Sequence, residues 1–269
     1  VTFQIRQLEE QYRTRLFERR TGDVALTPAG ELVFSYAERI LALNDELDTR
    51  LAELSGEVSG QLLIGASTTI GETLLPQLLG EFDALYPRVR ARLIVGNSET
   101  IASRVAERTV DIGAIDVESA LPGLDSTACG EEELIVICAP DHPLAKSSRV
   151  SPRTLVGYEY ISREPGSGTR ECIAAYFRES RFSADDLKTQ MELGSPESLK
   201  RVVASGLGFG IVSRGACEIE CRLGTLVAIP LNPVLRRRFF LIQPADRFRS
   251  RLVTTFVEFA RLRLGEMQS

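Results

Sequence analysis

The stretch that decides the fold is Gln4 to Glu31, which reads QIRQLEEQYRTRLFERRTGDVALTPAGE. Its first part places apolar residues at helical spacing with charged residues between them. A short basic turn follows, and then the strand-like segment Val24 to Leu26. Thr27-Pro28 predicts a second helix start, because Thr is a good N-cap and Pro suits the first helical position. The order helix, basic hairpin, long helix predicts part of a winged helix-turn-helix followed by a linker helix.

These residues resemble the signature of the LysR-type transcriptional regulators. In that family a recognition helix with the pattern Q-I-x-x-L-E precedes L-F-x-R, a wing and L-T-x-x-G. This chain carries QIRQLE at residues 4–9, LFER at 16–19 and LTPAG at 26–30. The resemblance implies that the sequence begins inside the recognition helix, without the family's first two helices. We therefore expect residues 1–27 to form a partial winged helix-turn-helix.

The resemblance also names the residues that would face double-stranded DNA. Gln and Arg side chains on the recognition helix can bond to the edges of adenine and guanine. Arginines at the tip of the wing contact phosphate and position the domain without reading sequence. The alternative for each arginine is an ordinary solvated surface. The candidates are Thr2, Phe3, Gln4, Arg6, Arg19 and Arg20.

Length and composition set the outer limits of this interpretation. A chain of 269 residues is long enough for roughly two domains. No apolar run approaches the ~18 residues of a membrane helix, so we expect a cytoplasmic protein with no membrane partner. The formal net charge of −5 does not indicate nucleic-acid binding by itself. The DNA-binding prediction therefore depends on the order of the motifs.

Residues 28–54 predict one long amphipathic helix, because apolar residues recur at three- and four-residue steps between charged ones. The alternative is a helix that packs on its own domain. Long helices with a thin apolar seam more often pair with another chain, and LysR-type linker helices pair in this way. We expect a homodimer or a dimer of dimers, that is, a homotetramer. Residues 55–60, SGEVSG, predict a hinge.

Beyond the hinge, apolar strand patterns alternate with helix patterns, which is typical of α/β domains with parallel strands. The LysR resemblance implies an effector domain of two α/β subdomains, like periplasmic solute-binding proteins. Two strands would cross between them, near residues 132–138 and 236–241. We expect residues 61–131 and 237–269 to form subdomain I and residues 132–236 to form subdomain II.

Four Ser- and Thr-rich helix starts each follow a predicted strand. They are ASTTIGE at 66–72, NSET at 97–100, EPGSGTR at 164–170 and Ser195-Pro196. Thr69 and Glu72 have capping-box spacing, which predicts that the first of these helices begins at Thr69. A helix N-terminus offers free N–H donors and about half a positive charge, which suits a small anion. In open α/β sheets such ends line one crevice, although the hydroxyls can also simply cap helices.

Three of these segments resemble one branch of the LysR family, the activators of sulfur assimilation and of carbon-dioxide-fixation genes. Their effectors are small anionic metabolites, so the resemblance implies an anionic co-inducer and neither a cofactor nor a catalysed reaction. Ser67, Thr69, Thr100 and Thr169 are the first candidates for contact with it. The full set of candidates is Ser67, Thr68, Thr69, Asn97, Ser98, Thr100, Ser167, Gly168, Thr169 and Ser195. A gap filled by the protein's own side chains would count against this interpretation.

Two rival functions stay open. One is a solute-binding receptor or an enzyme on the same scaffold, since fold does not fix function. The other is a thiol redox sensor, because Cys217 and Cys221 would face one another on a helix. A single histidine, His142, argues against a zinc site or a Ser-His-Asp triad. Glu132 and Glu133 are expected to be solvated, because charged side chains are rarely buried unpaired.

Overall fold

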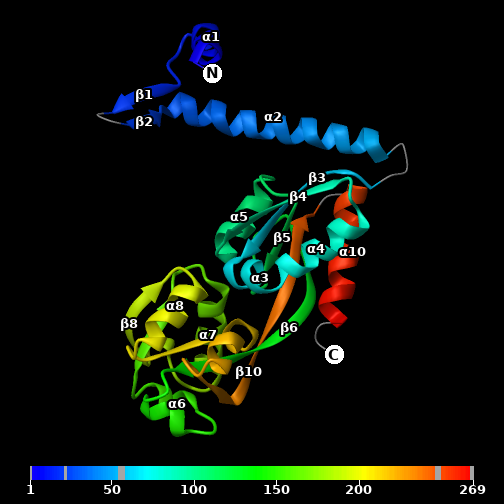
Figure 1. The fold of residues 1–269 in the computed structure, drawn as a ribbon. Helices are drawn as coiled ribbons and strands as arrows, with labels where there is room; N and C mark the ends of the chain where they lie inside the picture. Colours follow the sequence, from blue (N-terminus) through cyan, green and yellow to red (C-terminus); the bar gives the residue numbers. More distant parts are fainter. Residues whose placement is uncertain (1, 21–22, 54–57, 246–249, 267–269) are drawn as a thin grey trace.

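The computed structural model describes residues 2–20, 23–53, 58–245 and 250–266. Its N-terminal part consists of helix α1 (Thr2–Tyr12), the hairpin β1 (Phe17–Arg20) and β2 (Asp23–Leu26), and the long helix α2 (Pro28–Glu53). In Figure 1 this part lies above a larger α/β body, with α2 crossing over the end of the body near β3. The predicted order of helix, hairpin and long helix is therefore confirmed. The first half of the predicted hinge, residues 55–57, lies outside the described residues, and its last residue, Gly60, begins β3.

The junction between the hairpin and α2 explains why the sequence reads L-T-x-x-G. The hydroxyl of Thr27 accepts a hydrogen bond from the Gly30 amide at 3.0 Å and donates one to the Arg15 carbonyl at 2.7 Å. Gly30 lies so close to Leu16 that an added Cβ would be 2.0 Å from the Leu16 carbonyl oxygen. Thr27 thus caps α2 and ties it to the hairpin, and only glycine fits where the two meet.

Helix α2 carries six large apolar side chains that no described part of the chain covers. Leu32, Phe34, Tyr36, Ile40, Leu43 and Leu47 are all more than half exposed. Monomeric proteins rarely leave so large an apolar surface in contact with water. The members of the predicted seam that the structure describes, Tyr36, Ile40, Leu43 and Leu47, are all exposed on the helix.

The body is built on a single eight-stranded sheet with the strand order β4-β3-β5-β10-β6-β9-β7-β8. Its strands are β3 (Gly60–Ser67), β4 (Val89–Gly96), β5 (Ile112–Ile115), β6 (Leu124–Cys138), β7 (Glu159–Arg163), β8 (Lys188–Leu193), β9 (Phe209–Ser213) and β10 (Val227–Pro244). The α-helices are α3 (Thr68–Thr73), α4 (Leu75–Leu85), α5 (Ser98–Ala106), α6 (Pro152–Leu155), α7 (Gly168–Glu179), α8 (Pro196–Ala204), α9 (Glu218–Arg222) and α10 (Arg251–Glu266). Short 3₁₀ turns are η1 (Pro143–Lys146), η2 (Ala184–Asp186) and η3 (Gly215–Cys217).

The sheet divides the body into two halves that share two long strands. In the first half β3 is parallel to β4 and β5, and in the second half β7 is parallel to β8 and β9. Strands β6 and β10 run antiparallel to one another through both halves, as Figure 1 shows. Glu132 on β6 pairs with Arg237 on β10 at the point where the strands pass between the halves. The βαβ pattern and the crossing strands agree with the predicted fold class.

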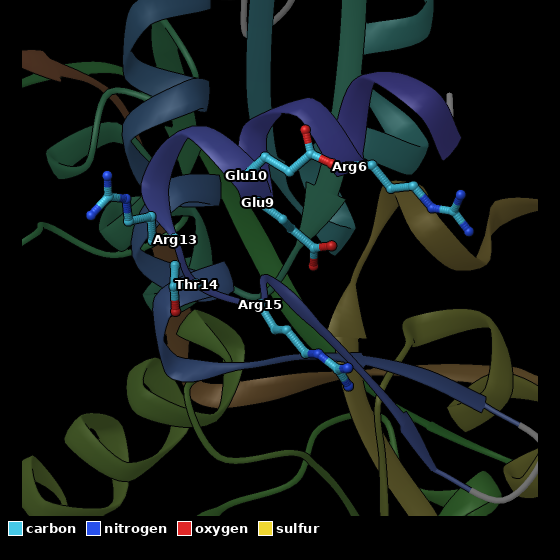
Figure 2. Close-up of a pocket in the computed structure, with 6 residues that line it drawn as sticks. All are labelled: Arg6, Glu9, Glu10, Arg13, Thr14 and Arg15. Atoms are coloured by element: carbon cyan, nitrogen blue, oxygen red, sulfur yellow. The ribbon is translucent and has the colours of Figure 1, made fainter.

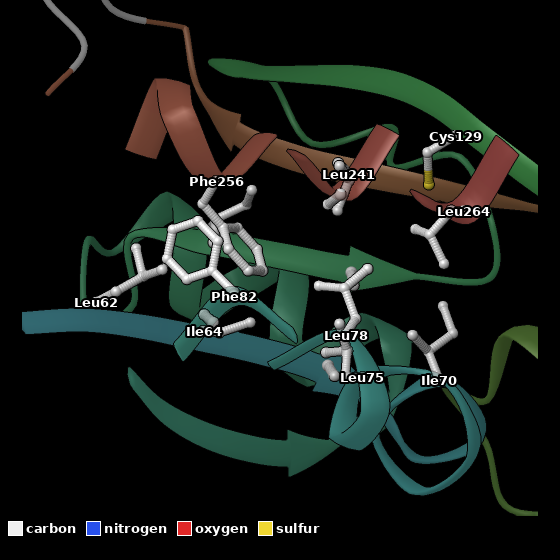
Figure 3. Packing of buried hydrophobic residues seen from close by; sticks show 14 of the residues in the cluster. Leu62, Ile64, Ile70, Leu75, Leu78, Phe82, Cys129, Leu241, Phe256 and Leu264 are labelled. Atoms are coloured by element: carbon white, nitrogen blue, oxygen red, sulfur yellow. The ribbon is translucent and has the colours of Figure 1, made fainter. Parts of the chain in front are cut away.

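Each half has its own hydrophobic core. In the first half, β3, α4 and α10 meet around Phe82 and Phe256, whose rings pack edge to face at 5.1 Å (Figure 3). In the second half, alternate residues of β6 enter cores on opposite faces of the sheet, with Val136 on one side and Ile137 on the other. Helices cover both faces of the sheet, so successive side chains of these strands are buried and the strands have continuous apolar sequences. Among the described residues, no helix is long and apolar enough to cross a membrane.

The structure corrects three details of the prediction. Strand β8 was not predicted, because KTQMEL is an exposed and mostly polar edge strand without an apolar pattern. Strands β6 and β10 are much longer than the apolar runs that indicated them. The helix that was predicted to begin at Thr69 is the short helix α3, and a second helix, α4, follows it after Leu74.

Candidate functional site

The helix start after β3 does not have the predicted capping box. Helix α3 begins at Thr68, and its N-cap is Ser67, whose side chain makes no capping bond. Thr68 donates its hydroxyl to the Gly96 carbonyl at 3.1 Å, and Thr69 is buried. The expected start at Thr69 is therefore wrong. Strand β3 pairs with β4 as far as Ser67, so tertiary pairing overrides the local spacing.

The starts of α5 and α8 have the predicted caps. Asn97 accepts a hydrogen bond from the Thr100 amide at 2.8 Å, and Ser195 accepts one from the Ser198 amide at 3.2 Å. Pro196 occupies the first turn of α8, as expected. The side chain of Thr100 is exposed, so this candidate lies at the rim of the site.

Residues from the two halves come into contact where α5 and α7 begin. The Asn97 amide donates to the Pro165 carbonyl at 3.2 Å, and the Glu99 backbone amide donates to the Gly166 carbonyl at 3.3 Å. Gly166 has φ of +78°, a backbone conformation that favours glycine. Ser167 is the N-cap of α7, and Gly168 and Thr169 form its first turn. The structure thus brings together two of the four predicted helix starts across the crevice.

A buried arginine lies between these two helix starts. The guanidinium of Arg237 donates through Nη1 to Asp116 Oδ2 and to Thr169 Oγ1, both at 2.5 Å, and through Nη2 to Glu132. Only 1% of the Arg237 side chain is exposed, and 3% of the Asp116 side chain. Asp116 follows β5 in the first half and Thr169 belongs to α7 in the second, so Arg237 joins the two halves.

Hydroxyl groups complete this network. Ser98, at the start of α5, donates to Asp116, and Ser213, at the end of β9, donates to Glu132. Burial lowers the pKa of Arg237, but Asp116 and Glu132 together raise it above its ordinary value. Two polar atoms in this region are buried without a hydrogen-bond partner among the described residues, Arg237 Nε and Ser67 Oγ. Such atoms are uncommon in native proteins, and they leave donors available inside the site.

Sequence reasoning missed Asp116 and Arg237 and was wrong about Glu132. The Glu132 side chain is only 16% exposed, because its carboxylate accepts bonds from Arg237 and Ser213. Glu133 pairs with Arg214 and keeps more contact with water. The signal available in the sequence was position, since Asp116 comes directly after the fully buried strand β5, as Ser67 comes at the end of the neighbouring strand β3.

Charged groups of the two halves also act on one another beyond the Arg237 network. Burial raises the pKa of Glu72 on α3, and the charges that act on it are Arg163, Glu197 and Lys200 from the second half. Burial, Glu99 and Asp116 raise the pKa of Glu171 on α7. The crevice therefore contains acidic groups as well as the arginine.

The N-terminal candidates lie on a separate surface. Gln4 and Arg6 are exposed on α1, while the side chains of Thr2, Phe3, Arg19 and Arg20 lie outside the described residues. A hollow of about 300 Å³ lies between α1 and the turn after it (Figure 2). Its lining residues are Arg6, Glu9, Glu10, Arg13, Thr14 and Arg15. Glu9 accepts from the Leu16 amide at 2.8 Å, which fixes the helix relative to the hairpin.

Most of the cysteine thiols are buried. Burial raises the pKa of Cys217 to about 12, and it also raises that of Cys129 to about 12 and that of Cys172 to about 11. A thiol reacts as its thiolate, so such values make these groups inert near neutral pH. No group of three or more His, Cys, Asp or Glu side chains in the described part of the chain is arranged to hold a metal ion.

Comparisons with known protein families identify both parts of the chain. Residues 55–265 match the family described as "LysR substrate binding domain". Residues 1–31 match the family described as "Bacterial regulatory helix-turn-helix protein, lysR family". A relative from Cyanidioschyzon merolae named "Probable RuBisCO transcriptional regulator" is 35% identical over 263 residues, or 96% of this chain and 86% of the relative. A relative of the same name from Nostoc is 34% identical over 95% of this chain and 77% of its own length.

Solved structures show the same architecture. The Synechocystis CcmR regulatory domain in complex with 2-PG is 27% identical, with a TM-score of 0.70 over 78% of this chain and 99% of that domain. A hydrogen-peroxide-bound mutant of OxyR from Corynebacterium glutamicum has a TM-score of 0.73 over 98% of this chain and 83% of its own, at 21% identity. The first likeness covers the α/β body, and the second extends over nearly the whole chain.

Proposed function

This chain belongs to the LysR family of transcriptional regulators, and from that premise we propose that it binds operator DNA and responds to a small anion held between the two halves of its body. The observation that carries the second part is the buried Arg237, which lies where the starts of α5 and α7 meet. A guanidinium beside a helix N-terminus is matched to carboxylate or phosphate in both charge and geometry. The likeness to a regulatory domain that binds 2-PG supports the same class of ligand.

The response that we propose is a shift in population between arrangements of the two halves. Ligand contacts to α5 and α7 favour one arrangement, and a ligand shifts such an equilibrium only by its difference in affinity between the two states. The altered body changes how subunits pack, and through α2 it changes the spacing of the DNA-binding segments. Strands β6 and β10 provide the mechanical link, since both pass through the two halves.

The proposed DNA surface is the exposed face of α1 together with the hairpin. Gln4 and Arg6 are exposed on α1, where they can reach base edges, and we propose phosphate contacts for Arg19 and Arg20 from their position in the sequence of the hairpin. If this surface binds operator DNA, the protein acts in the compartment that contains that DNA, which we propose is the cytoplasm. The test is capture of fragments of the source genome by the purified full-length protein, followed by sequencing. Absence of any enriched sequence, with and without 2-PG, contradicts the DNA-binding part of the proposal.

The exposed seam of α2 supports pairing of two chains as a homodimer, and a dimer of dimers is compatible with the same seam. Five of the six apolar side chains, all but Phe34, share one face of a helix of 26 residues, which is long enough for several heptads of pairing. Pairing through this helix holds two DNA-binding segments at a fixed separation. A palindromic or repeated operator is the expected consequence.

A direct test of the anion site uses Thr169, whose hydroxyl accepts from Arg237. Replacing Thr169 with Val keeps the shape and removes the hydroxyl, so we expect the affinity for 2-PG to fall roughly tenfold, since ~1.4 kcal/mol is lost with one charge-assisted hydrogen bond. Basal DNA binding should not change, because Thr169 lies far from α1 in the fold. Thr69→Val serves as a second variant from the opposite half. Equal affinity of both variants and wild type in calorimetry contradicts the assignment.

The rival functions have less support. We propose that the chain catalyses no reaction, and a receptor or enzyme without DNA function needs neither the hairpin nor the exposed seam of α2. A redox sensor needs a thiolate near neutral pH, and burial raises the pKa of Cys217 to about 12. The anion-sensing regulator accounts for all three parts of the molecule.

A further inference from the structure

We propose that the carboxylate of Asp116 is an internal substitute for the effector, so that the anionic group of the effector binds Arg237 and the start of α7 only by displacing Asp116. This inference rests on the proposed function and names the group with which the effector competes. It is carried by the position of Asp116, the unfilled donors around it and the charge balance of the network.

Asp116 lies where an anion is expected at the N-terminus of α7. Gly168 is the first residue of this 12-residue helix, and a Cβ added to it would be 2.2 Å from Asp116 Oδ1. The same Cβ would be 2.9 Å from Ser98 Oγ, which donates to Asp116. The carboxylate therefore lies directly against the first turn, where the helix presents its partial positive charge. No side chain larger than that of glycine fits between them.

Donors around the carboxylate are not fully used. The Thr169 hydroxyl accepts from Arg237 Nη1, so its own proton remains available to a further acceptor. Arg237 Nε is buried without a partner among the described residues. Ser67 Oγ is also buried without one, and its strand lies beside β5, with Ala66 in register with Ala114. A ligand with more oxygen acceptors than one carboxylate can satisfy these donors better than Asp116 does.

The charges of the network explain why displacement is required. Arg237 supplies one positive charge, whereas Asp116 and Glu132 supply two negative charges, so an added anion meets a net negative site. Each carboxylate accepts from one hydroxyl, Asp116 from Ser98 and Glu132 from Ser213, but of the two it is Asp116 that lies against the start of α7. Asp116 is therefore the carboxylate whose place the ligand takes. The ligand class that fits is a small molecule with a carboxylate or phosphate group, of which phosphate offers more acceptors.

An internal competitor leaves the site vacant in only a fraction of the molecules. The apparent affinity for the ligand is reduced in proportion to that fraction. Minor states are commonly populated at roughly 0.1–10%, so removing the competitor should tighten binding by about tenfold or more. We therefore expect Asp116→Ala in the full-length protein to bind 2-PG and inorganic phosphate at least ~10-fold more tightly than wild type in titration calorimetry. The matched control is Glu132→Gln, which removes the same charge from the same arginine without vacating the start of α7. Its affinity should change much less than that of Asp116→Ala.

Asp116→Asn keeps the shape of the side chain and removes its charge, and it provides the comparison if Asp116→Ala does not fold. Its affinity should exceed that of Glu132→Gln, because the amide no longer binds Arg237 as an anion. If wild type binds 2-PG and both Asp116 variants bind it equally or more weakly, the inference is wrong while the proposed function stands. The inference is also wrong if Glu132→Gln gives the same gain as Asp116→Ala. If wild type and every variant bind neither 2-PG nor inorganic phosphate, the proposed effector function fails as well.

Discussion

The Gly30→Ala substitution tests the junction that joins the DNA-binding hairpin to α2. In the structure, the added methyl carbon would lie 2.0 Å from the carbonyl oxygen of Leu16. Carbon and oxygen approach comfortably at about 3.3 Å, so α2 and the hairpin must separate by about 1.3 Å. The obstacle is backbone, and Leu16 is only 3% exposed, so no side-chain rotation relieves the contact.

Separation also strains the bonds that hold this junction. The Thr27 amide donates to the same Leu16 carbonyl at 3.0 Å, and the Thr27 hydroxyl donates to the Arg15 carbonyl at 2.7 Å. Overpacking costs about 1–3 kcal/mol, and each weakened hydrogen bond adds about 0.5–1.5 kcal/mol. We therefore expect Gly30→Ala to weaken operator binding by at least ~10-fold, which corresponds to ~1.4 kcal/mol. Fluorescence anisotropy with an operator fragment measures this loss.

Gly80→Ala provides the matched control. Gly80 lies in α4, and an added Cβ there meets no atom within 4 Å. Replacing an exposed helical glycine with alanine should stabilise the body by about 0.5–1 kcal/mol and leave operator affinity unchanged. Hydrogen exchange of the hairpin should be faster in Gly30→Ala and unaltered in Gly80→Ala. Wild-type operator affinity together with wild-type hairpin exchange in Gly30→Ala would refute the steric argument.

Three further predictions concern other parts of the molecule. Ile40→Glu places a charge in the exposed seam of α2 and should weaken self-association at least ~10-fold by sedimentation, since ~1.4 kcal/mol suffices; an unchanged association constant contradicts pairing through α2. Glu171→Gln should raise the Tm slightly at pH 7 but not near pH 4. Burial, Glu99 and Asp116 raise the pKa of Glu171 in the folded state, so its ionised form opposes folding as the pH rises. A difference in stability that does not depend on pH contradicts this explanation. Cys217→Ser and Cys221→Ser should keep the affinity for 2-PG and the DNA response, and loss of the response in either variant revives the redox interpretation.

Local patterns predicted the parts of this fold that local interactions determine. The caps at Asn97 and Ser195, and the Thr-Pro start of α2, follow from side chains that bond to amides one turn away. The start of α3 was misplaced because β3 continues in register with β4 through Ser67, a constraint that comes from another strand. Strand β8 is held by its neighbour β7 and not by an apolar pattern of its own.

The centre of the candidate site was not predictable in this way. Arg237 bonds to Asp116 across 121 positions of sequence and to Glu132 across 105. Each of these charged residues, considered alone, is expected on a solvated surface. Burial becomes energetically possible because the three side chains pair with one another. Two of the helix starts that were predicted from hydroxyl-rich loops, those of α5 and α7, do come into contact between the two halves. The buried charges of Arg237, Asp116 and Glu132 could be identified only from the structure.

The continuity of the sheet has a consequence for how a signal travels in this molecule. Strands β6 and β10 both pass from one half to the other, so relative motion of the halves must twist the two-stranded ribbon that they form. The pairing of that ribbon slips by one residue at Cys129, opposite the Phe239–Phe240 step, and is interrupted again between Pro230 and Leu235. A bulge bends its strand and increases the local twist, so the ribbon departs most from a regular ladder at these two points. We expect rotation of one half relative to the other to act mainly there.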